Sequence, residues 1–469
     1  MTHTTQAPPG PATRTTGDLA RAAVSGWLGT ALEFMDFQLY SLAAAVVFNK
    51  IFFPDVSPAI GLIAAMATYG VGYVARLAGA VYFGRLGDRI GRRKVLLVTI
   101  VLMGASTTLI GALPSYGAIG IAAPCLLVAL RLIQGFGAGA EIAGATALLT
   151  EYAPVRRRGL ISSLVSLGTN SGTLAASGLW AVLLGTLSDS QLLSWGWRVP
   201  FLSSFLLLVF AVWLRSRLKE SPVFEERPDV VDGVALSRKE LKELEDGAGA
   251  EGAAADREAR RAIEAGLRQR KGRAFFLALG LRLGQAGNSG LVQTFLVGYI
   301  ATSVAVNDSV PTTAIVYGSL LGFATVPFVG MLGDRFGRRP VYLAVTALTA
   351  LLAVPMMYTV VHGGTAALTL AMVVGLNCGV LGLFALESVT MAELFGSRTR
   401  FTQLALAKEL GGILTTAAGP VIAASLTAAT HHWWPIAAML IAYSLITFTA
   451  TWFSPETKGR DLVRLEDAA

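Results

Sequence analysis

Long apolar stretches recur from one end of the chain to the other, separated by shorter polar connections. We identify twelve of them, at residues 22–48, 59–83, 95–113, 120–150, 160–187, 198–216, 274–303, 312–332, 341–361, 366–392, 401–429 and 435–453. A helix needs about 20 apolar residues to cross a bilayer. The pattern therefore predicts an all-α membrane protein with twelve transmembrane helices and with both chain ends on the same side.

The basic residues lie mainly on one set of alternate connections. That set holds 32 of the 38 Lys and Arg, whereas the other set holds only Lys50 and Arg198. Because basic connections resist translocation, we expect both termini in the cytoplasm. The net charge of +8 then reflects topology, and nucleic acid is not expected as a partner. With 54% hydrophobic and 14% charged residues, a soluble enzyme is excluded.

The polar segments divide the chain into halves. We expect a disordered cytoplasmic tail at 1–21, a six-helix half at 22–216, a cytoplasmic linker with a charged helix at 217–273, a second six-helix half at 274–453 and a tail at 454–469. The linker pairs acidic and basic residues at helical spacing. This is typical of a solvated surface helix, and a regulatory partner site is the alternative.

One loop occurs twice. Residues 84–94 (GRLGDRIGRRK) return as 330–340 (GMLGDRFGRRP), with eight of eleven positions identical. The two copies follow the second span of each half. Two related six-span halves with the same loop predict a pseudo-two-fold transporter whose binding site lies between the halves.

The repeated loop resembles the hallmark of the major facilitator superfamily. Stretches at 29–40, 52–54, 131–136, 195–201 and 220–224 further resemble its metabolite:proton symporter branch, which includes proline/betaine, α-ketoglutarate and shikimate permeases. The resemblance implies alternating access, a small-molecule substrate and protons as partners, and a monomer in the bacterial inner membrane. Residues 76–77 and 139–144 depart from the branch pattern, which leaves the substrate open.

The repeated loop offers the residues of a cytoplasmic gate. Its glycines allow close backbone approach, its aspartates can accept hydrogen bonds from a helix N-terminus, and its arginines can pair with carboxylates. By resemblance these groups hold the outward-open state; the alternative is that the arginines only fix topology. The predicted gate residues are Gly84, Asp88, Arg89, Arg92, Gly330, Asp334, Arg335, Arg338, Glu151 and Glu393.

Ionisable residues inside the spans are functional candidates, because charge in a bilayer is costly. The spans contain no histidine, so carboxylates would have to carry protons. Glu33, Asp36 and Tyr40 share one face of the first span. We expect Asp36 to be the main proton acceptor, with Glu33 assisting it or holding an arginine. A permanently paired ion bridge is the alternative.

Two arginines within spans of the first half, Arg131 and Arg76, have different predicted roles. Arg131 matches the superfamily's Arg-x-x-Gln-Gly motif, which implies proton coupling or gating, and Glu141 is placed in the same group. The alternative is a structural pair of Arg131 with Asp36 or Glu141. Arg76 is the first choice for holding a substrate carboxylate, unless it supports the adjacent gate.

Other polar residues lie at suitable depth for substrate contacts, although interhelical hydrogen bonds would explain them too. Together with Arg76, the predicted substrate-binding set is Tyr40, Asn170, Arg282, Gln285, Asn288 and Asn377. Lys408 and Glu409 are adjacent and are expected to point to different faces. Lys408 either serves the substrate or extends to the cytoplasm.

These features predict a secondary transporter that imports a small carboxylate-bearing metabolite with protons. A sugar porter remains an alternative, because residues 455–459 (PETKG) resemble a sugar-porter signature. A drug/proton antiporter would share the same fold. A membrane-embedded hydrolase lacks a convergent catalytic set, and no cofactor or metal is expected, because no phosphate-binding loop follows the glycine-rich runs.

Overall fold

The computed structural model describes residues 15–55, 58–221, 223–224, 229–231, 234–236, 272–304, 306–307, 309–397 and 399–462. Residues 1–14 of the tail predicted at 1–21 lie outside the described residues, and so does the predicted charged helix of the linker. Within the described part, each of the twelve expected spans coincides with helical backbone. The twelve-helix prediction is therefore confirmed.

The first half contains long helices joined by short connections. Its elements are α1 (Thr16–Ala43), η1 (Ala44–Phe48), α2 (Asn49–Phe52), α3 (Pro58–Ile90), α4 (Arg92–Ala112), α5 (Tyr116–Ile119), α6 (Ala122–Ala138), α7 (Glu141–Tyr152), η2 (Val155–Arg157), α8 (Arg158–Thr186), α9 (Asp189–Gln191), η3 (Leu192–Gly196) and α10 (Arg198–Ser216). A short antiparallel hairpin of β1 (Asp229–Val231) and β2 (Val234–Leu236) follows in the linker.

The second half repeats this arrangement. It contains a helix over 272–289, followed by η4 (Gly290–Phe295), α14 (Leu296–Ser303), α15 (Ser309–Phe336), α16 (Arg338–His362), α17 (Thr365–Gly375), η5 (Leu376–Gly382), α18 (Leu383–Leu394), α19 (Arg400–Gly411), η6 (Gly412–Ala417), α20 (Ala418–Thr430) and α21 (Trp434–Phe453). Three spans of this half thus contain a π-helical stretch, η4, η5 or η6. Such stretches occur frequently at functional sites.

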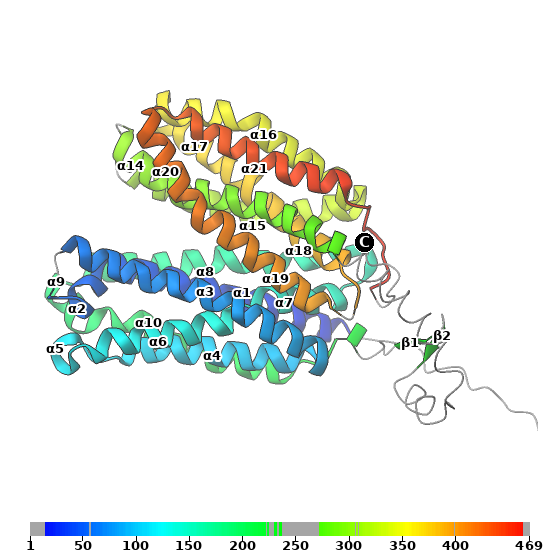
Figure 1. Cartoon of the computed structure of the whole chain (residues 1–469), viewed down its shortest axis with the longest axis horizontal. Coiled ribbons are helices and arrows are strands. Elements are labelled where there is room, and N and C mark those ends of the chain that lie inside the picture. Colours follow the sequence, from blue (N-terminus) through cyan, green and yellow to red (C-terminus); the bar gives the residue numbers. More distant parts are fainter. Residues whose placement is uncertain are drawn as a thin grey trace, which may run out of the picture.

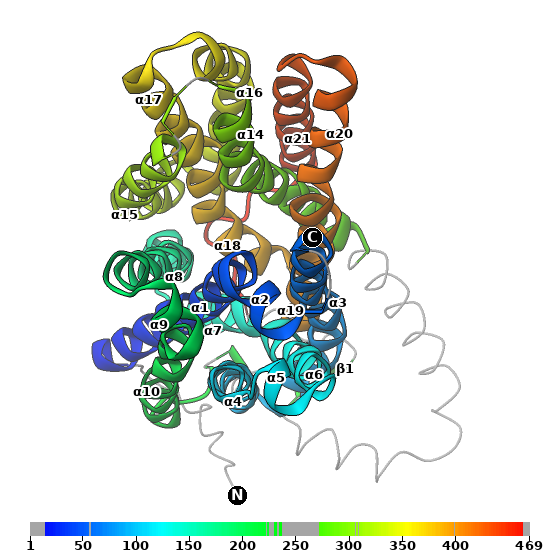
Figure 2. The same ribbon diagram turned by 90° about the vertical axis from the view of Figure 1, so that its left-hand side faces the viewer.

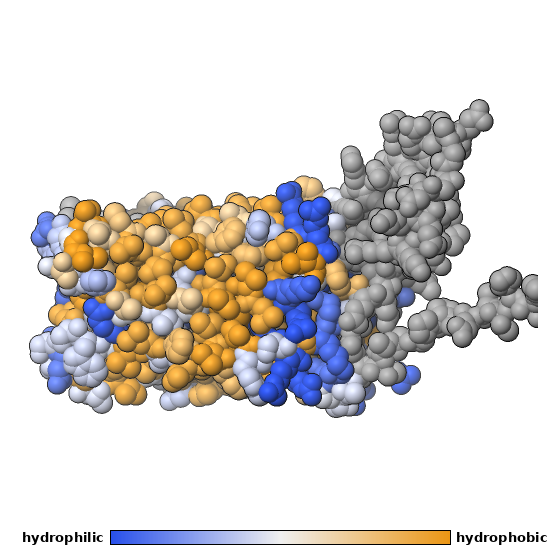
Figure 3. Space-filling view, turned by 90° about the horizontal axis from the view of Figure 1, so that it is seen from below, coloured by the Kyte–Doolittle hydropathy of each residue, from blue (hydrophilic) through white to orange (hydrophobic). Residues whose placement is uncertain are grey.

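The two halves form separate helical layers that lie side by side (Figures 1 and 2). They meet where α8 packs against α15 and α18, and where α3 and α7 pack against α19. Eight helical segments of the described chain are long and apolar enough to cross a membrane. Figure 3 shows a broad apolar surface along the bundle, bounded toward one end by a band of hydrophilic residues.

The repeated loops lie at that hydrophilic end, which we call the basic end. The helix α1 begins here at Thr16, six residues before the expected span. A capping box starts it: the Thr15 hydroxyl accepts a hydrogen bond from the Asp18 amide at 3.2 Å, and the Asp18 carboxylate accepts one from the Thr15 amide at 3.2 Å. Residues 16–21 are therefore helical, although the sequence placed them in a disordered tail.

Candidate functional site

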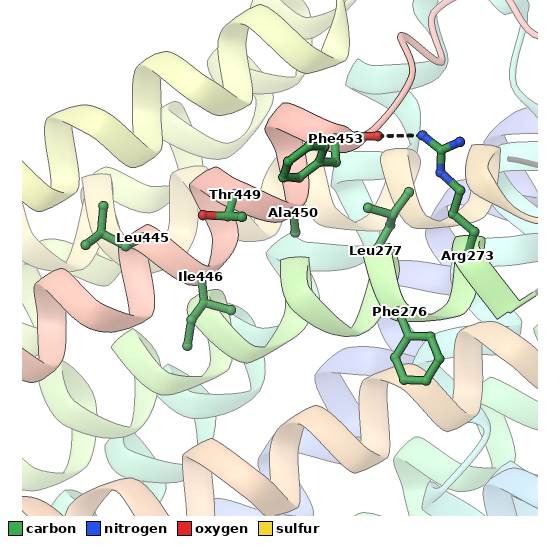
Figure 4. Close-up of a pocket in the computed structure, with 8 residues that line it drawn as sticks. All are labelled: Arg273, Phe276, Leu277, Leu445, Ile446, Thr449, Ala450 and Phe453. Carbon is green, nitrogen blue, oxygen red and sulfur yellow. Dashed lines mark hydrogen bonds between the residues drawn. The ribbon is translucent and has the colours of Figure 1, made fainter.

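A groove of about 720 Å³ lies on the outer surface, between the helix over 272–289 and α21 (Figure 4). Most of its lining is apolar, and Phe276, Leu445 and Phe453 are exposed. At one end Arg273 donates a hydrogen bond to the Phe453 carbonyl at 3.2 Å. This groove brings no acidic group to the arginine and belongs to the apolar outer surface.

A second cavity, of about 510 Å³, lies between the two halves. In the first half its walls come mainly from α1, α3 and α8. In the second half they come mainly from the 272–289 helix, α15, α18, α19 and the π-helical stretches η4, η5 and η6. The charged residues that line it are Glu33, Arg76, Arg282, Lys408 and Glu409. Buried charge at membrane depth marks substrate or ion pathways, so this cavity is the candidate site.

Three of these residues form a cluster across the boundary between the halves. Arg76 holds Glu409 with two parallel hydrogen bonds, from Nε at 2.6 Å and from Nη2 at 2.7 Å. Its Nη1 lies 2.6 Å from a carboxylate oxygen of Glu33. The guanidinium also lies over the ring of Phe37, at 4.9 Å. We call Glu33, Arg76 and Glu409 the acidic triad, because its formal charge is −1.

A second cluster belongs entirely to the second half. The carboxylate of Glu387 in α18 accepts a hydrogen bond from Lys408 Nζ at 2.9 Å and one from Arg282 Nη1 at 3.4 Å. Arg282 also donates to Gln285 at 2.6 Å. Glu387 is fully buried and is not part of the cavity wall, so it holds both cations from behind. We call Arg282, Lys408 and Glu387 the basic triad, with a formal charge of +1.

Asp36 lies in a separate buried chain of polar groups within the first half. Its carboxylate accepts a hydrogen bond from Thr107 at 2.6 Å, and the Thr107 hydroxyl accepts one from Gln134 at 2.5 Å. Gln134 in turn accepts from Arg131, whose guanidinium lies 3.8 Å from the ring centre of Tyr40. The structure thus connects Asp36 to Arg131 through two neutral side chains.

Glu141 starts α7 and binds a partner that the sequence did not suggest. It pairs with Arg215 in the last turn of α10, with Nη1 at 3.0 Å from Oε2, and it accepts a hydrogen bond from Thr99 at 2.9 Å. Arg215, which lies at the end of the predicted span 198–216, was not singled out from the sequence. Both members of this pair are almost fully buried.

The predicted substrate-binding residues divide into two groups. Four of them line the cavity: Arg76, Asn170, Arg282 and Gln285. The other three do not. Asn288 donates to Ser444 at 3.4 Å, Asn377 donates to the Gly318 carbonyl at 3.0 Å, and Tyr40 is buried with its hydroxyl against Thr68.

The first copy of the repeated loop holds the second half at the basic end. Asp88 accepts hydrogen bonds from the backbone amides of Phe401 and Thr402, at 3.2 and 2.9 Å, and so caps the N-terminus of α19. Gly84 permits this approach, because a Cβ there would lie 2.7 Å from the Thr402 Cα. Close backbone contact of this kind requires glycine.

The second copy makes the reciprocal contact. Asp334 accepts hydrogen bonds from the amides of Gly159 and Leu160, both at 2.8 Å, and so caps the N-terminus of α8. A Cβ at Gly330 would lie 2.9 Å from the Gly159 carbonyl oxygen. Each half therefore caps one helix of the other.

Two buried glutamates complete this arrangement. Glu151 lies 3.3 Å from Arg92 of its own half and 2.6 Å from Arg400 of the other. Glu393 lies 3.2 Å from Arg338 of its own half and 3.3 Å from Arg158 of the other. We call the contacts of Asp88, Asp334, Glu151 and Glu393 the latch. The exposed Arg89 and Arg335 lie outside it.

Sequence reasoning missed one pair of residues that supports the latch. Glu220 and Glu456 accept hydrogen bonds from the amides of Arg92 and Arg338, both at 2.9 Å, and so cap α4 and α16. The sequence pattern that could have identified them is a Glu next to a Ser-Pro pair, just beyond the last span of each half. Glu220 precedes its Ser-Pro pair, and Glu456 follows its own. The C-terminal segment also contacts the latch, because Arg400 donates to the Leu462 carbonyl at 2.8 Å.

Comparison with known proteins places this geometry among transporters. Residues 39–468 match the family of sugar (and other) transporters. The chain is 51% identical to the putative transporter YdfJ of Escherichia coli, over 93% of this chain and 96% of that protein. It is 34% identical to the shikimate transporter of Escherichia coli, over 91% and 92% of the two chains. The proton:xylose symporter XylE has the same fold, with a TM-score of 0.74 at 18% identity over 97% of this chain and 99% of that one.

Proposed function

This chain belongs to the sugar (and other) transporter family of the major facilitator superfamily, and from that we propose that it moves a small carboxylate-bearing metabolite together with protons by alternating access. The supporting observation is the charged cavity between the halves. Three cationic side chains line it, Arg76, Arg282 and Lys408. A guanidinium in a water-poor cavity suits a carboxylate ligand.

We assign the basic end to the cytoplasm of a bacterial inner membrane, with a single chain as the transporting unit. The distribution of Lys and Arg supports this orientation, and so does the similarity to bacterial transporters. The latch then closes the cytoplasmic side. Opening toward the cytoplasm requires that the two capped helices separate from Asp88 and Asp334, and that Glu151 and Glu393 each give up one arginine.

Protons would use the buried carboxylates of α1. Asp36 is the main acceptor in this proposal, because its only charged neighbour along the described hydrogen-bond chain is Arg131, reached through Thr107 and Gln134. Glu33 assists by holding Arg76. Protonation of Asp36 changes the hydrogen bonds between α1 and α4 and α6, and thereby links proton binding to movement of the first half.

Uptake into proteoliposomes under an imposed pH gradient tests this function. We expect accumulation of an organic acid or betaine only when the gradient is present. Asp36→Asn should abolish gradient-driven accumulation but retain exchange of labelled for unlabelled substrate. The matched control is Asp189→Asn, the same change in an exposed connection at the opposite end. Accumulation that ignores the gradient and survives Asp36→Asn contradicts proton coupling.

A sugar porter is the second candidate, because the matching family includes sugar transporters. Sugars need neutral hydrogen-bonding groups, and Asn170, Gln285 and Gln293 in the cavity wall supply some. Inhibition of uptake by glucose, without inhibition by succinate, shikimate or betaines, would favour this candidate. Extrusion of a drug from loaded vesicles would favour an antiporter.

A further inference from the structure

The two triads bring opposite formal charges to the wall of the cavity. In the acidic triad, two carboxylates share the single guanidinium of Arg76. In the basic triad, Arg282 and Lys408 share the single carboxylate of Glu387. The two formal charges cancel, so the charged groups of the two triads are neutral overall but divided into one negative and one positive cluster.

The basic triad is arranged to receive an anionic group. Lys408 and Arg282 belong to the cavity wall, whereas their common carboxylate lies behind them. The Arg282 side chain keeps 17% of its surface exposed. Arg282 forms its hydrogen bonds to other described residues through Nε and Nη1, which leaves Nη2 without a hydrogen-bond partner among those residues. A ligand carboxylate would therefore find a donor already oriented toward the cavity.

The acidic triad is arranged differently, because all three of its members line the cavity. Arg76 already holds two carboxylates, Glu409 through Nε and Nη2 and Glu33 through Nη1, so a ligand carboxylate would meet an excess of negative charge here. Two aromatic rings that line the cavity lie beside the triad, since the Arg76 guanidinium is 4.9 Å from the ring centre of Phe37 and 5.7 Å from that of Tyr73. Carboxylates next to aromatic faces favour an alkylated cation.

We propose that the substrate is a zwitterion, with its carboxylate at Arg282 and Lys408 and its cationic group between Glu33, Glu409 and the aromatic wall. This rests on the proposed function and names its substrate class. It also makes the adjacent residues Lys408 and Glu409 of α19 the residues that determine specificity, one for each end of the ligand. A simple anion would leave the acidic triad, whose side chains are at most 9% exposed, without a counter-charge, which is costly.

Matched ligand series test the charge requirement on the wild-type protein. In the first series, glycine betaine is compared with 3,3-dimethylbutyrate, which replaces its nitrogen by carbon, and with choline, which lacks the carboxylate. In the second, proline is compared with cyclopentanecarboxylate and pyrrolidine. Thermal stabilisation of the purified protein reports binding. We expect the zwitterion of at least one series to stabilise it at a concentration about tenfold lower than either isostere, since each isostere leaves one triad uncompensated.

Charge-neutralising variants should shift this preference in opposite directions. Glu409→Gln removes the excess negative charge of the acidic triad. The affinity for the anionic isostere should therefore rise about tenfold relative to the affinity for the zwitterion. Lys408→Gln removes the excess positive charge of the basic triad, so the affinity for the cationic isostere should rise relative to the affinity for the zwitterion. Lys408→Arg keeps the charge and should keep the wild-type ranking. A loss of folding would weaken the thermal stabilisation by all three ligands together, so it cannot produce shifts in opposite directions.

The outcomes separate this inference from the function on which it rests. Stabilisation and gradient-driven uptake of shikimate or succinate, with no zwitterion of either series bound, would overturn the zwitterion assignment and leave proton-coupled transport standing. An anionic isostere that binds as well as its zwitterion in the wild-type protein would overturn it too. Zwitterion binding without gradient-driven uptake would support the charge assignment and contradict proton coupling instead.

Discussion

The latch and the cavity are built from the same two halves, yet only the latch repeats. Glu151 and Glu393 are separated by 242 positions, and so are their partners from the opposite half, Arg158 and Arg400. Each glutamate takes one arginine from each half, and each loop aspartate caps a helix of the other half. At the basic end the two halves therefore do the same mechanical work with equivalent residues.

The cavity breaks this equivalence within the same helices. At the offset of 246 that relates the two loops, Arg76 corresponds to Gly322. At the offset of 242 that relates the two glutamates, Glu387 corresponds to Ala145 and Lys408 to Ser166. A ligand with two different ends needs two different walls, whereas a latch that closes one side can use the same contact twice. Symmetry thus separates the residues that move the halves from those that select the ligand.

The largest expected effect comes from removing one latch glutamate. Among the described residues, Glu151→Ala leaves Arg400 without a carboxylate and Arg92 with only Asp88, at 3.5 Å, although both arginines are at most 1% exposed. Breaking a buried ion pair at one partner costs about 3–5 kcal/mol. Because the contacts are equivalent, Glu393→Ala should lower the stability by a similar amount. Thermal unfolding of the purified variants in detergent measures both.

The control for this comparison is a carboxylate outside the latch. Asp189→Ala in the exposed connection before α10 should leave the unfolding temperature near that of the wild type. If Glu151→Ala destabilised the protein strongly and Glu393→Ala scarcely at all, the two halves of the latch would not be equivalent, and the symmetric mechanical role would be wrong.

A smaller effect is expected from the helix-capping aspartates. Asp88→Asn and Asp334→Asn keep one acceptor oxygen but lose the charge at a helix N-terminus, which costs about 1 kcal/mol each. Weaker capping should let the basic end open more often. Labelling of Ser163→Cys, which is buried between α8 and α15, by a maleimide from that side should become faster in both variants, with Cys125 and Cys378 replaced by serine. Unchanged labelling would show that the caps do not hold the basic end closed.

Much of the latch could be predicted from the sequence, because the same residue types occur at equivalent positions in both halves. The repetition of Asp88 as Asp334 and of Glu151 as Glu393 identified the acidic groups, and helix N-termini are the natural partners of an aspartate near a helix end. The structure places all four in inter-half contacts. The twelve spans were equally predictable, since bilayer thickness fixes their length.

The cavity was less predictable, because partner choice there depends on how each helix is rotated about its axis. The sequence placed Arg76 and Lys408 inside predicted spans, but it did not indicate that Arg76 would pair with Glu409 or that Lys408 would pair with Glu387. These pairs join residues of different helices, and no local spacing encodes them. Arg215 was missed for another reason: a basic residue at the end of a predicted span is expected to face the cytoplasm, whereas Arg215 in the last turn of α10 is buried against Glu141.

The smallest expected effect comes from two arginines of the repeated loop that the latch does not use. Arg89 and Arg335 are exposed, unlike Arg92 and Arg338, which are buried against Glu151 and Glu393. Exposed charges contribute less than about 1 kcal/mol to stability. Arg89→Gln and Arg335→Gln should therefore leave the unfolding temperature near that of the wild type and change the uptake rate by less than about twofold. Arg92→Gln should lower both strongly, because it leaves Glu151 with a single arginine. A contrary result would be that Arg89→Gln slows uptake as much as Arg92→Gln without lowering stability. Arg89 would then have to make a functional contact in a conformation other than this one, and it would have to be added to the latch.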